Sequence, residues 1–120
     1  MTSVTAEPTF LIHQATHQFV AEPIHFQVLQ MNKSVFVWIG KDEAKLGDMS
    51  VAVPPFGNQS TAAATSIIVK GIAEQGKNLA RSLALKYKQQ FFVSLNLNNP
   101  DDMLILFIEK KLMELLKNIM

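Results

Sequence analysis

With 120 residues, the chain has room for one domain with one hydrophobic core. Apolar residues make up 48% of it and charged residues only 18%, against roughly 25% in an ordinary globular domain, so some apolar surface should remain available to a partner. The net charge of +1 favours neither nucleic acid nor an anionic membrane, and the absence of cysteine excludes disulfides, thiolate zinc sites and cysteine nucleophiles.

The N-terminal residues 1–8 are polar and end in Pro8, which predicts a flexible leader ahead of a single domain at residues 9–120. The leader lacks the basic and long apolar regions of a signal peptide. The longest apolar run, residues 103–108, is far shorter than the roughly 20 residues of a membrane span. With no cysteine present, these features indicate a cytosolic protein that is also small enough to enter the nucleus.

The first half of the chain is rich in predicted strands. Residues 9–20 carry many aromatic and β-branched side chains and predict a first strand. The runs 24–31 and 34–39 are separated by only Asn32 and Lys33. Because asparagine tolerates the left-handed backbone of a two-residue turn, this spacing predicts a β-hairpin.

The hairpin turn fixes the register of its two strands. If Met31 pairs with Ser34, one face carries only apolar side chains and must turn to the core: Phe26, Val28, Val37 and Ile39. The other face mixes aromatic, aliphatic and polar side chains: His25, Gln27, Leu29, Phe36 and Trp38. That mixture is neither a core pattern nor an ordinary wet surface.

The middle of the chain predicts two strands and a helix. A strand at 48–53 ends at Pro54 and Pro55, and another at 62–69 contains alanines that would equally suit a helix. Periodicity over residues 72–87 predicts a helix with one apolar stripe, formed by Ile72, Leu79, Ala80, Leu83 and Tyr87. Gly76 falls within that stripe, where a missing side chain would allow close approach to the sheet.

A strand and a helix complete the predicted fold. Residues 90–97 alternate, with Phe91, Val93, Leu95 and Leu97 on one side and Phe92, Ser94 and Asn96 on the other. The last helix is predicted to begin after Asn99, which suits the N-cap, with Pro100 at the first helical position, and to end near Asn118. Asp101 and Asp102 would then lie at the positive end of the helix dipole. Its predicted buried stripe comprises Ile105, Ile108, Leu112, Leu115 and Ile119.

This order of elements predicts an α+β domain. We expect a mostly antiparallel β-sheet of about six strands, with two main helices packed on one face and the other face available for a partner sheet. The candidates for that partner interface are Leu29, Phe36, Trp38, Phe92 and Ser94. Alternatively, the aromatic side chains of this face pack under the leader.

No catalytic, cofactor-binding or metal site is predicted. His13 and His17 stand four residues apart, and Glu22 or His25 could supply a third metal ligand, so a metal-dependent hydrolase is one alternative. We prefer to interpret the three histidines as solvent-facing strand residues. The sequence shows no phosphate loop, no nucleophile motif and no carboxylate pair suited to acid–base chemistry.

A modest basic edge lies on the first helix, at Lys77, Arg81 and Lys88. Such an edge is usually a solvated helix face, and without a basic surplus it does not indicate nucleic-acid binding. It could instead contact an acidic protein surface and steer association, which makes these residues the client-contact candidates.

Three segments resemble the proteasome assembly chaperone 4 family. They are His25-Phe26-Gln27-Val28 followed by residues 34–40, then Leu79-Ala80-Arg81, and then residues 88–97 leading into the Asn-Pro-Asp start of the last helix. The similarity runs from about residue 10 to 117. The sequence departs from the family in the Ala-Thr-Ser stretch at 60–66 and in Pro54-Pro55.

The resemblance implies a chaperone that pairs with proteasome assembly chaperone 3. Such a heterodimer assists assembly of the α-subunit ring of the proteasome core particle through transient contacts with α-subunits. The family is neither an enzyme nor an ATP user. For this chain we expect no cofactor and no nucleic-acid, membrane or small-molecule partner. The alternative is a small dimerisation or scaffold subunit of another protein complex.

Overall fold

Strands dominate the first half of the computed structural model, which describes residues 11–41, 47–55, 62–68, 74–97 and 101–120. The described elements are, in chain order, β1 (Leu11–Phe19), β2 (Glu22–Met31), β3 (Ser34–Gly40), β4 (Met49–Val53), β5 (Ala63–Ile68), α1 (Glu74–Tyr87), β6 (Gln90–Asn96) and α2 (Asp102–Ile119). The predicted leader at 1–8 lies outside these residues. The sequence left strand and helix both open for residues 62–69, and the structure shows the strand β5 there.

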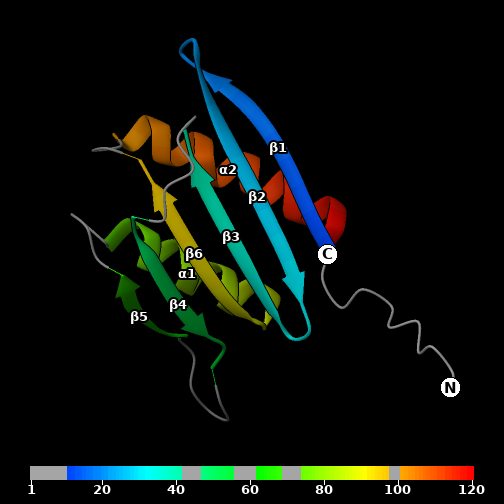
Figure 1. Ribbon diagram of the computed structural model, residues 1–120. Coiled ribbons are helices and arrows are strands. Elements are labelled where there is room, and N and C mark those ends of the chain that lie inside the picture. Colours follow the sequence, from blue (N-terminus) through cyan, green and yellow to red (C-terminus); the bar gives the residue numbers. More distant parts are fainter. Residues whose placement is uncertain (1–10, 42–46, 56–61, 69–73, 98–100) are drawn as a thin grey trace, which may run out of the picture.

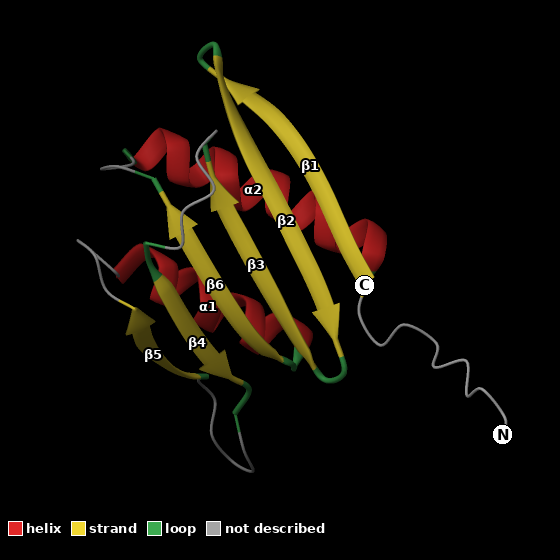
Figure 2. Ribbon diagram, viewed as in Figure 1, coloured by secondary structure: helices red, strands yellow, loops and turns green. Residues whose placement is uncertain are grey.

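The strands form one six-stranded sheet in the order β1-β2-β3-β6-β4-β5. β3 and β6 run parallel, and the other neighbours run antiparallel. Both helices cover the same face: α2 lies behind β1, β2 and β3, and α1 behind the other half of the sheet (Figures 1 and 2). The predicted α+β class and mostly antiparallel sheet are therefore confirmed.

The predicted hairpin register is also confirmed. Met31 pairs with Ser34 and Val28 pairs with Val37. In the turn, however, Lys33 adopts a left-handed conformation with φ 65°, whereas the sequence had pointed to Asn32 for that role. Strand β1 joins the sheet through a second tight turn, at which Val20 and Ala21 both have positive φ.

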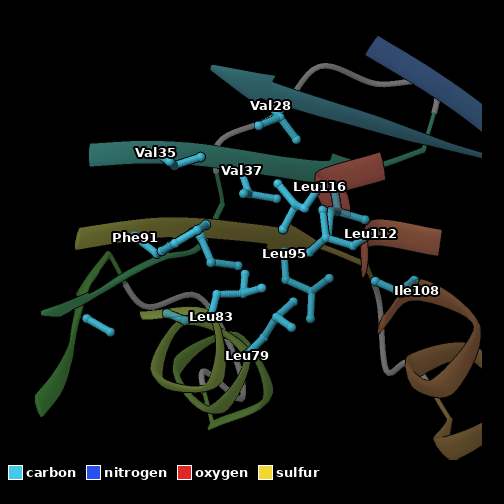
Figure 3. Close-up of a cluster of buried hydrophobic side chains, with 14 of the residues drawn as sticks. Val28, Val35, Val37, Leu79, Leu83, Phe91, Leu95, Ile108, Leu112 and Leu116 are labelled. Atoms are coloured by element: carbon cyan, nitrogen blue, oxygen red, sulfur yellow. The ribbon is translucent and has the colours of Figure 1, made fainter. Parts of the chain in front are cut away.

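One apolar core fills the space between the sheet and the two helices (Figure 3). Its largest fully buried side chains are Ile24, Phe26, Val28, Val35, Val37, Ile39, Leu83, Phe91, Val93, Ile108, Leu112 and Leu116. On α2 the buried stripe is centred on Ile108, Leu112 and Leu116. Ile108 and Leu112 are buried as predicted, but Leu116 is fully buried in place of the predicted Leu115, which is only half-buried.

The start of α2 differs from the prediction. Its N-cap is Asp101, whose Oδ1 accepts a hydrogen bond from the backbone N–H of Leu104 at 2.8 Å. The predicted N-cap, Asn99, was therefore wrong, and residues 98–100 lie outside the described part. An aspartate caps a helix as well as an asparagine does, so the sequence offered two equivalent starts two residues apart.

A buried polar group sits between the sheet and α1. Asp48 is 7% exposed, and its Oδ2 lies 3.5 Å from the point where a Cβ on Gly76 would stand, which is an ordinary van der Waals distance. Gly76 faces the sheet as predicted, but a Cβ would fit at this position, so the close approach does not require a glycine. Within the described residues, Asp48 Oδ1 and the buried Ser50 Oγ have no hydrogen-bond partner. Burial raises the pKa of the Asp48 carboxyl above 3.8 by desolvation, which a hydrogen bond from the Met49 backbone partly offsets.

This raised pKa predicts how one substitution will respond to pH. The folded state binds the Asp48 proton more tightly than the unfolded state, so the carboxyl weakens folding once pH rises through its folded-state pKa. Asp48→Asn should therefore be more stable than the wild type at pH 7, and this advantage should shrink as pH falls towards 3.8. Denaturant unfolding of the variant and the wild type, at pH 7 and near pH 3.8, measures this difference in stability. A difference that is the same at both would show that the carboxyl is not desolvated.

Candidate functional site

The sheet face opposite the helices, here called the open face, carries a row of apolar side chains. Directly paired residues share a face, so the register aligns Ile12, Leu29, Phe36, Phe92 and Val51 across five strands. Ile12 is 66% exposed, and the other four are partly exposed. This apolar row crosses the sheet at right angles to its strands, and both described helices lie on the opposite face (Figure 2).

Trp38 lies beside the apolar row, two residues after Phe36 on β3. Its ring extends over Gly40: a Cβ built on that glycine would lie 2.6 Å from a carbon of the indole ring. Because real Cβ atoms essentially never come so close, a larger residue at position 40 would displace the ring. The absent side chain of Gly40 thus leaves room for the ring of the half-buried Trp38 on the open face, where a partner can cover its remaining surface.

Four of the five predicted interface residues lie on this accessible surface, and the fifth does not. Ser94 is fully buried, and its Oγ donates a hydrogen bond to the carbonyl oxygen of Asp48. The Asn96 amide donates to Ser94 Oγ at 2.8 Å and accepts from the Gly47 backbone N–H at 2.7 Å. Ser94 therefore bonds to Asp48, just before β4, and to Asn96, although the alternation along β6 placed it correctly on the open face.

The predicted basic edge is spread along α1 and is partly neutralised. Lys77 forms an ion pair with Glu74 at 3.3 Å, and Arg81 donates to Asn78 Oδ1 at 3.0 Å. Lys88 follows the last residue of α1 in a left-handed conformation, with φ 57°. It borders a hollow at the end of the sheet, lined by Gln30, Met31, Asn32, Lys33, Val53, Pro54, Lys88, Gln89 and Gln90.

The three histidines do not converge. His13 and His17 face α2 rather than solvent, which corrects our interpretation. His13 Nε2 lies 2.9 Å from Gln30 Oε1, and the ring centroids of His17 and Phe26 are 5.7 Å apart. His25 lies on the open face beside Thr16. The described residues hold no group of three histidine, aspartate or glutamate side chains placed to bind a metal ion, and this arrangement does not support the hydrolase alternative.

Comparison with known proteins identifies relatives of the chain. The family model for proteasome assembly chaperone 4 matches residues 23–97, which span β2 to β6. Proteasome assembly chaperone 4 from Homo sapiens is 29% identical over 103 residues, covering 86% of this chain and 82% of the relative. The protein of the same name from Mus musculus is 25% identical over 119 residues, covering 91% of this chain and 87% of the relative.

A solved structure shares the fold. It is a chain of the crystal structure of a novel chaperone complex for yeast 20S proteasome assembly, which superimposes with a TM-score of 0.70 at 13% sequence identity. The match covers 92% of this chain and 97% of that chain. At this identity the likeness establishes the fold.

Neither described helix is long and apolar enough to cross a membrane.

Proposed function

Since the chain belongs to the proteasome assembly chaperone 4 family, we propose that it pairs with proteasome assembly chaperone 3 and promotes assembly of the α-subunit ring of the proteasome core particle. The family model, the human and mouse relatives and the yeast fold relative all carry proteasome assembly in their descriptions. We infer that the chain acts by binding alone in the cytoplasm, and its size would also allow entry into the nucleus.

The observation that carries the proposal is the apolar row on the open face. A single sheet covered by helices on one side leaves such a row partly in water, and a second sheet packed over it would bury the row. Leu29, Phe36 and Phe92, with Trp38 beside them, form the aromatic and aliphatic centre typical of a stable interface. The partner chaperone therefore occupies the open face, as a lasting partner would.

The client meets a different surface. A chaperone that must later leave its client needs a limited, polar contact. The basic edge at Lys77, Arg81 and Lys88, here also called the α1 flank, offers such a contact. Opposite charge on an α-subunit would speed the encounter without adding much lasting affinity.

Charge reversal on this flank should slow client capture. We expect Arg81→Glu with Lys88→Glu to slow α-subunit association by about tenfold at low ionic strength and by less at about 0.15 M salt, because screening weakens steering. Pairing with chaperone 3 should be unchanged. Stopped-flow mixing gives the rate, and Lys110→Glu with Lys117→Glu on exposed α2 positions is the matched control. Loss of the partner with normal capture of α-subunits would mean that the two surfaces are exchanged.

Affinity purification followed by mass spectrometry tests the function as a whole. We expect chaperone 3 and proteasome α-subunits to copurify with the tagged chain, and finished proteasomes to be absent. Stable recovery of an unrelated complex without either protein would favour the scaffold alternative and contradict the proposal.

A further inference from the structure

The outer edge of β1 has no strand beside it in the described part of the chain. β1 pairs with β2 alone, through nine consecutive residue pairs. Backbone N–H and C=O groups along its other side therefore point away from the sheet. An edge of this length is a template for a further strand.

The two edges of the sheet differ in how well they are protected against strand addition. At the other edge, β5 has six residues and its register with β4 shifts at Met49/Ser50. β1 has nine residues, an unbroken register, no proline and no lysine, arginine, aspartate or glutamate. Short strands, irregular pairing and edge charges are the usual devices that block addition. β1 lacks all of them.

The surroundings of β1 favour a strand of moderate apolarity. Leu11 and Ile12, at the start of β1, are 54% and 66% exposed. At the far end, Phe19 packs against Phe107 of α2, with ring centroids 5.0 Å apart. α2 passes behind this edge (Figure 1), so an added strand would lie beside the helix that covers β1.

We propose that the β1 edge takes up an extended, uncharged segment of the client α-subunit as a seventh strand of the sheet. This inference rests on the proposed function, and it adds a contact made by the backbone rather than by the α1 flank. Backbone pairing along an edge gives affinity with little dependence on sequence, which suits a chaperone that meets related subunits.

A second copy of the chain fits this edge less well. Two β1 strands paired about a two-fold axis would place both copies of α2 on the same face of the joined sheet. Because Phe107 already packs behind β1, the two helices would meet at the junction. A lone strand brings no helix with it, so the client segment is the better occupant.

The test adds charge to each edge in turn. Gln14→Lys with Gln18→Lys places two lysines at exposed, open-face positions of β1. Ala63→Lys with Thr65→Lys places two at exposed positions of β5, as a control with the same added charge. Because all four positions lie on the open face, sedimentation first verifies that each full-length variant still pairs with chaperone 3. The pairs are then titrated with individually purified proteasome α-subunits. Amide hydrogen exchange of residues 11–19 is followed in parallel.

The expected result is at least a tenfold weaker α-subunit affinity for the β1 variant alone, with slowed exchange of wild-type β1 amides on binding. Equal affinity for both variants, or unchanged exchange, would overturn the inference and leave the proposed function standing. Wild-type self-association that the β1 lysines abolish would assign the edge to a second copy instead. Failure of the wild type to bind any α-subunit would contradict the proposed function and this inference together.

Discussion

Leu112→Ala is expected to lower the free energy of unfolding by about 2–5 kcal/mol. Leu112 is fully buried at the centre of the α2 stripe, between Ile108 and Leu116 (Figure 3). Truncation removes its apolar contacts and leaves a cavity that the surrounding sheet and helix can only partly fill. Equilibrium denaturant unfolding, monitored by circular dichroism, gives the value.

Leu115→Ala is the matched control for the orientation of α2. Leu115 is half-buried on the same helix, so its truncation should have a clearly smaller effect than that of Leu112. A loss below about 1 kcal/mol for Leu112→Ala, or a larger loss for Leu115→Ala, would show that α2 is rotated from the orientation described.

The second large effect is expected at the open face. Trp38→Ala should weaken pairing with the partner chaperone by about thirtyfold or more, because a central tryptophan in an interface typically contributes 2 kcal/mol or more to binding. Helix content should stay largely intact, since Trp38 lies on the face away from both helices and the core. Sedimentation velocity of mixed partners and far-ultraviolet circular dichroism measure the two quantities.

Leu85→Ala provides the comparison for Trp38. Leu85 is a large apolar residue, 45% exposed on α1, and therefore lies on the helical side of the molecule. Its removal should leave pairing unchanged. If the Trp38 variant sedimented in the same state as the wild type, the open face would not be the site of pairing.

The β2–β3 hairpin was predictable because its signals are local. Two apolar strands separated by a two-residue turn fix both the pairing and the two faces, and every expected pair from Met31–Ser34 onwards is present. The alternation along β6 likewise placed Phe92 on the open face. These features depend on neighbours in sequence, which a periodic pattern records directly.

Features that depend on distant segments were not predictable. The buried Ser94 donates its hydrogen bond to Asp48, 46 residues away in the sequence. No hairpin was predicted between β1 and β2, because Val20 is a β-branched residue that rarely adopts the positive φ it has in this turn. The insertion of β6 between β3 and β4 likewise comes from the overall topology.

The burial of Leu116 in place of the predicted Leu115 on α2 has a related cause. Its sequence carries apolar residues around much of the helix, including Met103 and Leu106, which are 68% and 62% exposed. Several neighbouring stripes were therefore acceptable, and packing against the sheet selected Ile108, Leu112 and Leu116.

The most direct test of the central claim, that the open face pairs with the partner chaperone, is native mass spectrometry of the purified chain mixed with proteasome assembly chaperone 3 and then with α-subunits. We predict a one-to-one complex of the two chaperones that gains an α-subunit, and loss of that pair with Trp38→Ala. A wild-type chain that stays alone in the presence of chaperone 3, or a Trp38→Ala variant that pairs as the wild type does, would contradict it.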